Sequence, residues 1–235
     1  MSHQLPNLRP ALIAAAALLT ALLLAFLLPR FLLPHWPILA PKFFLGWIAA
    51  LFLLTTVANI LWTARANSFT TAFVGYAFLT DSAAVLLLIL GLTTGLLRFP
   101  DILRLYLLLL TWSAAWSAFT YLLRRRPPLA AAVAITCSAI FFAAPITALP
   151  LARASSHREN TLQFISYATP ILPAFDAVRS SLPAVGWPEW PVMYRLSDIS
   201  QEIALRARWH RAALIYAVVA GVHALACYRR RHAKA

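Results

Sequence analysis

The sequence contains few charged residues, and very few of them are acids. Charged residues make up 11% of the 235 positions, with 7 Asp and Glu against 20 Lys and Arg, whereas hydrophobic residues make up 62%. A soluble domain has about 25% charged and about 45–50% apolar residues. A soluble fold of this length could not bury so much apolar surface, so the composition excludes one and indicates a membrane protein.

The chain also has few of the residues from which cofactor sites are usually built. Its 2 cysteines, Cys137 and Cys227, lie in apolar segments with no metal-type spacing, and we interpret both as small buried hydrophobic residues. His210 and His223 share one apolar segment, but no other histidine lies in an apolar segment to provide a second haem ligand. We therefore interpret His223 as a packed or interfacial histidine and expect no metal and no cofactor.

Catalytic motifs are absent as well. The sequence has no Gly-x-Ser-x-Gly, no His-Glu-x-x-His and no Gly-x-x-x-x-Gly-Lys-Ser/Thr motif. We therefore expect that the chain is not an enzyme and does not bind ATP through a P-loop. The apolar segments also lack the paired carboxylates of proton-coupled pumps, since Asp81 is the only acid within them.

What the sequence has instead is a series of long apolar runs. A helix needs about 20 apolar residues to cross about 30 Å of hydrocarbon, and helices leave no backbone group unsatisfied in lipid. The runs are too continuous for the alternating strands of a barrel. No small-x-small cleavage site follows the first run, so we expect it to be an uncleaved span. The sequence therefore predicts an all-α polytopic membrane protein with six transmembrane helices, at residues 11–28, 43–62, 80–97, 102–123, 129–149 and 209–228.

The third run allows two interpretations. From Phe69 to Leu97 it would form about 43 Å of helix at about 1.5 Å per residue, with Asp81 near its middle. Either this is one strongly tilted helix in which Asp81 is functional, or the span begins near Thr80 and Asp81 lies in its first turn, where an acid suits the helix dipole. We favour the second interpretation, which makes residues 64–79 a separate short helix or elbow at the cytoplasmic surface.

The basic residues predict which end of each span is cytoplasmic. The clusters Arg124–Arg126 and Arg229–Arg231 are separated by two crossings, so both lie on one side, and the positive-inside rule assigns that side to the cytoplasm. Both termini and the turn around Arg65 then face the cytoplasm. The Arg-rich, Ala-rich composition indicates that the source is a bacterium. We interpret the net charge of +13 as an orientation signal with some attraction to anionic lipids, and not as a nucleic-acid footprint.

Residues 150–208 form a long extracytoplasmic segment between the fifth and sixth spans. Prolines and tryptophans recur through it, which excludes a long helix and favours the membrane–water interface. We predict short re-entrant or interfacial helices here. Asp198 and Gln201 resemble a capping box that starts the helix leading into the last span.

Small residues mark two candidate helix-packing motifs. Gly91 and Gly95 stand four apart in the third span, and Ser113 and Ser117 stand four apart in the fourth. Such pairs allow helices to approach closely in a membrane. They fit packing within one subunit or, alternatively, a dimer face.

This layout resembles the permease subunit of type-2 ABC transporters, and the resemblance covers most of the chain. The stretch Ser166–Val178 (SYATPILPAFDAV) is similar to the proline-containing outer stretch of that family. Leu105–Leu123 followed by Arg124–Arg126 is similar to its fourth span and basic exit. Trp209 at the start of the last span and Arg229–Arg231 at its end also fit.

The resemblance implies a separate ATP-binding cassette subunit that couples to the elbow, and a homodimer or heterodimer of permease subunits. The family's Glu-Arg…Gly-Thr pattern at the elbow is missing, and only Arg65 and Thr71 correspond to it. The candidate coupling residues are Arg65, Thr71, Asp81, Arg124, Arg125 and Arg126. The candidate outer-gate residues are Pro170, Pro173, Phe175, Asp176, Trp187 and Trp190.

The sequence therefore supports three hypotheses about function. The first is a permease subunit of an ATP-driven transporter that works by alternating access, with ATP hydrolysed by another chain. The second is a non-transporting scaffold or accessory subunit of a larger complex, which the scarcity of polar groups in the spans would fit. The third is a membrane-embedded enzyme or biogenesis factor that acts at the outer surface. The residues that would serve this third hypothesis are His157, Glu159, Asp176, Trp187 and Glu189.

Overall fold

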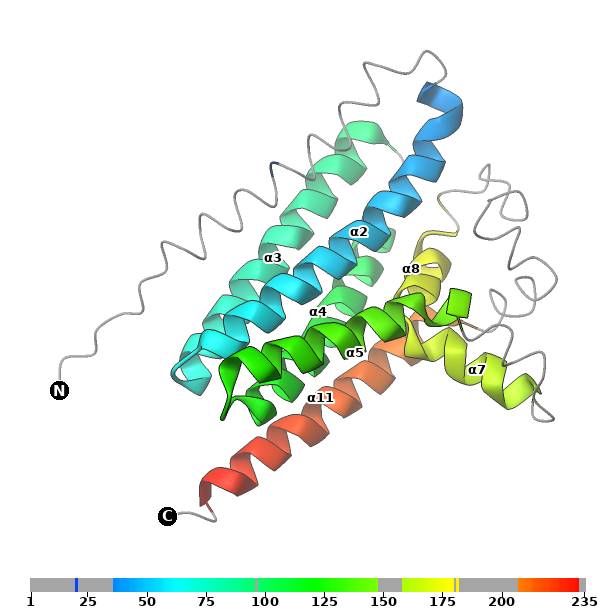
Figure 1. Ribbon diagram of the computed structural model, residues 1–235. Coiled ribbons are helices and arrows are strands. Elements are labelled where there is room, and N and C mark those ends of the chain that lie inside the picture. The colour runs from blue at the N-terminus through cyan, green and yellow to red at the C-terminus, as the bar shows by residue number, and fades with distance from the viewer. Residues whose placement is uncertain are drawn as a thin grey trace.

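The computed structural model describes residue 20 and residues 36–95, 97–147, 158–179, 181 and 207–232. Every regular element in this part of the chain is an α-helix (Figure 1). Five helices in it are long and apolar enough to cross a membrane, which fits a multi-pass membrane protein. The predicted first span, 11–28, lies outside the described residues except for residue 20. The five helices are α2 (Trp36–Arg65), α3 (Phe69–Thr94), α4 (Phe99–Leu123), α5 (Pro127–Thr147) and α11 (Trp209–His232).

Helix α3 corrects the interpretation of the third apolar run. It is one continuous helix of 26 residues, so the predicted elbow at 64–79 and the predicted helix start near Thr80 are both wrong. The helix starts after Ser68 because the Ser68 hydroxyl oxygen accepts a hydrogen bond from the Thr71 backbone N–H at 3.0 Å, which satisfies an otherwise unpaired donor. No proline follows to interrupt it. Gly95 ends the helix in the left-handed conformation, with a φ of 66°.

Asp81 consequently lies near the middle of α3 and not in a first turn. A carboxylate without a partner would be costly at that depth in hydrocarbon. The hydroxyl of Tyr106 on α4 donates a hydrogen bond to Asp81 Oδ1 at 2.8 Å, which offsets part of this cost. The sequence does not show this pairing because the two residues lie on different helices.

The basic clusters lie at one end of the bundle. The α2–α3 turn and the α4–α5 turn are side by side there, and Arg124 Nη1 donates to the Asn67 carbonyl oxygen at 3.4 Å. The C-terminal end of α11 lies at the same end (Figure 1). Arg65, Arg125 and Arg126 are exposed at these turns. The two basic clusters that predict orientation from the sequence therefore lie at the same end of the bundle.

Helix α4 occupies the centre of the bundle and packs against α2, α3, α5 and α11. Its fully buried leucines are Leu105, Leu108 and Leu109. The helices are apolar around their whole circumference, so burial alone does not select which faces meet. Buried hydrogen bonds contribute to that selection. Trp112 Nε1 donates to Thr56 Oγ1 on α2 at 3.0 Å, and Asn59 Nδ2 of α2 donates to Thr80 Oγ1 on α3 at 3.3 Å.

Two short helices follow α5, in the segment for which the sequence predicts short helices. They are α7 (Arg158–Ala168) and α8 (Ile171–Val178). Helix α7 packs against α5 at the end of the bundle opposite the basic turns (Figure 1). Helix α8 is largely buried and packs against α2, α4 and α11. The predicted capping box at 198–201 lies outside the described residues.

Candidate functional site

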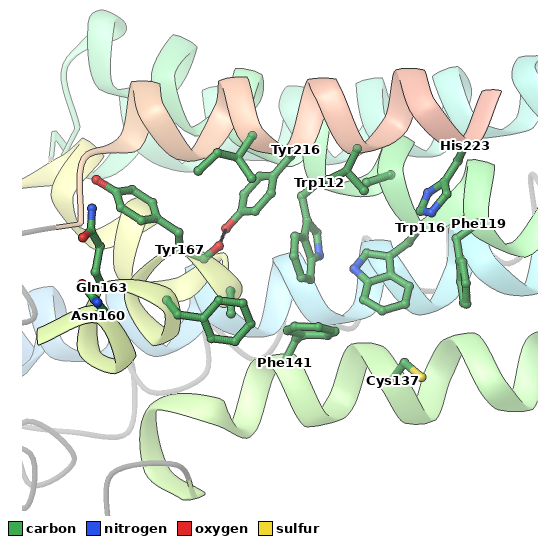
Figure 2. A pocket seen from close by; sticks show the side chains of 15 residues that line it. Trp112, Trp116, Phe119, Cys137, Phe141, Asn160, Gln163, Tyr167, Tyr216 and His223 are labelled. Carbon is green, nitrogen blue, oxygen red and sulfur yellow. Dashed lines mark hydrogen bonds between the residues drawn. The ribbon is translucent and has the colours of Figure 1, made fainter. Parts of the chain in front are cut away.

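A cavity of about 640 Å³ lies between α4, α5, α7 and α11 (Figure 2). Ligand pockets in proteins usually have volumes of about 300–1,000 Å³, so this one is large enough for a small molecule. Its lining is mostly aromatic and aliphatic, with few polar groups. The lining residues are Trp112, Ala115, Trp116, Phe119, Cys137, Phe141, Asn160, Gln163, Phe164, Tyr167, Ala168, Ile215, Tyr216, Val219 and His223.

Two tryptophans one turn apart on α4 form the floor of the cavity. Trp112 and Trp116 are both buried, and their rings meet edge to face with centroids 5.6 Å apart. The hydrogen bond to Thr56 fixes the Trp112 ring from behind, and an edge-to-face contact with Tyr216 of α11, at 5.0 Å, fixes it from the side. Such ring pairs contribute about 0.5–1.5 kcal/mol beyond burial. The floor is therefore formed by contacts within the protein and does not need a ligand to hold it.

Polar groups lie toward two opposite ends of the cavity (Figure 2). Asn160 and Gln163 line the end formed by α7, and both are exposed. Cys137 of α5 and His223 of α11 line the other end. The His223 ring packs on Phe119 with centroids 5.5 Å apart, and His223 Nδ1 is buried with no hydrogen-bond partner in the described part of the chain. The middle of the cavity is apolar.

Tyr216 fixes the α7 wall of the cavity to α11. Its hydroxyl lies 2.9 Å from the carbonyl oxygen of Tyr167 and 2.9 Å from that of Thr169, and its single hydrogen is shared between these two acceptors. These carbonyls lie at the C-terminal end of α7 and in the corner before α8, where a helix leaves acceptors without intrahelical donors. Because the same ring contacts Trp112, one side chain links the cavity floor to the α7–α8 corner.

The predicted outer-gate residues include four in the described part of the chain. Pro170 is the N-cap of α8, while Pro173 and Phe175 are buried on it. They form part of the core at this end of the bundle. Trp187 and Trp190 lie outside the described residues.

Asp176, the fourth of these residues, connects α8 to α11. Its Oδ2 atom accepts a hydrogen bond from the backbone N–H of Trp209 at 3.1 Å. Its Oδ1 atom lies 3.9 Å from Arg208 Nη1. A carboxylate at a helix N-terminus is favourable both as a hydrogen-bond acceptor and because of the helix dipole. The described contacts of Asp176 are therefore structural.

The predicted coupling residues fall in two places. Arg65 and Arg124–Arg126 gather at the basic end. Thr71 lies in the first turn of α3 at that end, where its carbonyl oxygen accepts a hydrogen bond from Trp62 Nε1 at 3.0 Å. Asp81 lies halfway along α3 and is not part of this group.

The predicted packing residues have different surroundings. A Cβ at Gly91 would lie 2.9 Å from Ile102 Cδ1, so Gly91 faces α4 of the same chain. Gly95 has open space around it and serves as the C-cap of α3. Ser113 and Ser117 are buried on α4, and their hydroxyls have no hydrogen-bond partner in the part of the chain that the structure describes.

The described residues hold no group of three or more His, Cys, Asp or Glu side chains that could bind a metal ion. Neither Cys137 nor Cys227 forms a disulfide in the part of the chain that the structure describes. Among the residues considered for an enzyme at the outer surface, Asp176 contacts α11 and Glu159 belongs to α7. The remaining three, His157, Trp187 and Glu189, lie outside the described residues.

The sequence did not indicate the aromatic-lined cavity. Trp112, Trp116 and Phe119 recur at helical spacing and so share one face of α4, which was the available signal. A shared face does not reveal whether it packs against another helix or lines a hollow. Tyr216 and His223, which come from a helix far along the chain, complete the lining.

Comparisons with known proteins provide no family or fold assignment. No family model, no curated protein and no solved structure matches the chain. A function has therefore to be argued from the layout and geometry of the chain itself.

Proposed function

We propose that the chain is the membrane-spanning permease subunit of an ATP-driven transporter in which a separate subunit hydrolyses ATP. The observation that carries this proposal is the pair of short helices between α5 and α11. Helix α8 folds back and is buried against α2, α4 and α11. The resemblance to type-2 ABC permeases implies short re-entrant helices at this place in the chain. A simple linker between two spans would not need buried contacts with three of them.

The basic end of the bundle is the proposed docking surface for the ATPase. With this end in the cytoplasm, as the positive-inside rule predicts, the chain lies in the inner membrane of a bacterium with both termini inside. The α2–α3 and α4–α5 turns are adjacent there, so one partner can push on both. Because α3 is continuous from Phe69 to Thr94, a displacement of its first turn is carried to its far end.

The energy source in this proposal lies on another chain. Asp81 is the one acid in the middle of a described span, and ion-coupled pumps use several such groups. Two permease subunits, identical or related, would enclose the substrate path between them. The α7–α8 pairs would then close its outer end.

Co-purification tests the proposal. The tagged full-length chain is expressed together with its neighbouring genes and purified in a mild detergent. We expect an ATP-binding cassette protein to co-purify and to hydrolyse ATP. Reversal of two exposed charges, Arg125→Glu with Arg126→Glu, should reduce the amount of co-purified ATPase about tenfold, which corresponds to about 1.4 kcal/mol of binding free energy. Arg98→Glu, an exposed arginine at the other end of α4, is the matched control and should have no effect.

A C-terminal reporter of membrane orientation accompanies each variant, because loss of cytoplasmic arginines can also invert a span. An unchanged orientation with lost ATPase assigns the effect to docking. Absence of any ATP-binding protein from the purified wild-type complex contradicts the proposal. Co-purification of other membrane proteins in that case would favour the scaffold hypothesis.

A further inference from the structure

The aromatic-lined cavity opens at the side of the bundle. Helix α11 packs mainly on α4, and α5 packs on α2 and α4, so α5 and α11 form two walls above the α4 floor (Figure 2). Three of the apolar lining residues reach the surface of the protein. Phe164 is 68% exposed, Ile215 is 42% exposed and Val219 is 39% exposed. A ligand can therefore enter between the two walls.

The two helices that form the walls have apolar outer surfaces. In a membrane-spanning helix, such faces contact either acyl chains or another helix. Acyl chains can therefore reach a cavity that opens between these helices wherever no other helix covers it. The exposed large hydrophobic residues on the walls include Val133 and Ile140 on α5 and Leu214, Val218 and Val222 on α11.

The volume of the cavity restricts what can fill it. The cavity holds about 640 Å³, which lies within the range of about 300–1,000 Å³ that is usual for small-ligand pockets. A single flexible hydrocarbon chain is a ligand of this kind.

The polar residues restrict how a ligand would lie. Asn160 and Gln163 are exposed on α7, at the end of the bundle, and their amides can both donate and accept hydrogen bonds. From there the lining becomes aromatic along Trp112 and Trp116. An amphiphile with its polar end at α7 and its apolar tail over the two tryptophans would match this gradient.

We propose that the cavity binds one acyl chain of a phospholipid from the surrounding bilayer, with the ester and headgroup region at Asn160 and Gln163. The acyl chain enters laterally between α5 and α11 and lies across Trp112 and Trp116. The site is preformed, because Thr56 and Tyr216 hold the Trp112 ring in place. This inference does not depend on the proposed transport function and can hold if that proposal fails.

Photolabelling tests the acyl-chain site. The full-length chain is reconstituted in nanodiscs of phosphatidylethanolamine and phosphatidylglycerol with a trace of phosphatidylglycerol that carries a diazirine in one acyl chain. After illumination, labelled peptides are mapped by mass spectrometry. We expect label on Trp112 and Trp116, which are 4% and 8% exposed and can be reached by lipid through the cavity. Label on the exposed faces of α5 and α11 serves as an internal reference for ordinary lipid contact.

A pair of adjacent valines provides the matched variants. Val219 lines the cavity, whereas Val218 is 57% exposed on α11 and does not line it. Val219→Trp should fill the cavity and lower labelling of Trp112 and Trp116 at least fivefold, and Val218→Trp should leave it unchanged. A second pair serves if one of these variants fails to fold. Ile215→Trp changes a lining residue and should lower labelling, whereas Leu214→Trp changes an exposed residue outside the lining and is its control.

The headgroup contact has a separate readout. Asn160→Leu with Gln163→Leu should lower the fraction of protein that retains a phospholipid in native mass spectrometry by about fivefold, which corresponds to the loss of about one net hydrogen bond. The proposal is overturned if Trp112 and Trp116 of the wild-type chain carry no label, or if the cavity-filling and control variants are labelled alike. Protection of this face from the lipid label by a second copy of the chain would also overturn it.

Discussion

Asp176 Oδ2 accepts a hydrogen bond from the backbone N–H of Trp209 at 3.1 Å, which places a carboxylate of α8 at the first residue of α11. The first residues of any helix carry N–H groups without intrahelical partners. Here a distant segment satisfies one of them. The position of the short helix α8 and the start of the last span therefore depend on each other.

We predict that this cap contributes measurably to stability. Asp176→Ala should lower the free energy of unfolding by about 1–2 kcal/mol, because the Trp209 N–H loses its acceptor and α11 loses a favourable charge. Asp176→Asn should cost less, since the amide oxygen can still accept. Arg208→Gln removes only a partly exposed ion pair and should cost less than about 0.5 kcal/mol. Unfolding of the purified variants in detergent, followed by intrinsic fluorescence, measures all three. Equal losses for Asn and Ala would show that charge, and not capping, is the dominant contribution.

The hydroxyl of Tyr216 is predicted to hold the α7–α8 corner. Tyr216→Phe leaves the carbonyls of Tyr167 and Thr169 without this donor, which should cost about 1–3 kcal/mol and increase proteolytic cleavage between α7 and α8. Tyr76→Phe is the control. Its hydroxyl also donates to a carbonyl, but that acceptor, Leu110, lies within α4 and keeps its helical hydrogen bond, so the cost should be smaller. Equal cleavage of wild-type protein and Tyr216→Phe would refute this role.

The apolar runs predicted the helices because length and hydropathy alone decide whether a segment can span a membrane. The fourth predicted span, 102–123, thus differs from α4 (Phe99–Leu123) by only a few residues at its start. The predicted start of the third span was wrong because Asp81 was interpreted as a residue of the first helical turn. The competing signal, Ser68 as an N-cap, lies 13 residues earlier and is weak in sequence.

The cavity could not be predicted for a different reason. In a soluble helix the apolar stripe identifies the buried face, but α4, α5 and α11 are apolar all round and carry no such stripe. Which faces meet depends on buried hydrogen bonds such as that of Trp112 with Thr56, and these join residues 56 positions apart. The α8 cap on α11 is hidden from the sequence for the same reason.

The pair formed by Tyr106 and Asp81 leads to an asymmetric prediction. Tyr106→Phe leaves the Asp81 carboxylate without this donor in the middle of a span, so it should destabilise the protein by about 1–3 kcal/mol. Asp81→Leu removes the charge together with its solvation cost and should be less harmful, or stabilising. The double variant should behave like Asp81→Leu alone, because without the Asp81 carboxylate the Tyr106 hydroxyl makes no hydrogen bond to this position that its removal could break. Unfolding measurements on the four proteins give the coupling energy, and a value near zero would contradict the pairing.

Gly75 is predicted to be required for the contact between α2 and α3. A Cβ at this position would overlap the indole ring of Trp62, whose Nε1 donates to the Thr71 carbonyl oxygen. Alanine is favoured over glycine inside a helix by about 0.5–1 kcal/mol, yet Gly75→Ala should destabilise the protein by about 1–3 kcal/mol, because overlap in a packed interface outweighs helix propensity.

Gly221→Ala is the control that separates these two effects. Gly221 lies inside α11 with nothing near its Cβ position, so the substitution should be neutral or should stabilise the protein by up to about 1 kcal/mol. Combining Gly75→Ala with Trp62→Leu should recover part of the loss, because the smaller side chain makes room for the added methyl group while giving up one hydrogen bond. Recovery in the double variant would assign the cost to the indole contact. A loss that is simply additive would instead mean that Gly75 is needed for the backbone of α3, and that α2 and α3 do not approach through Trp62.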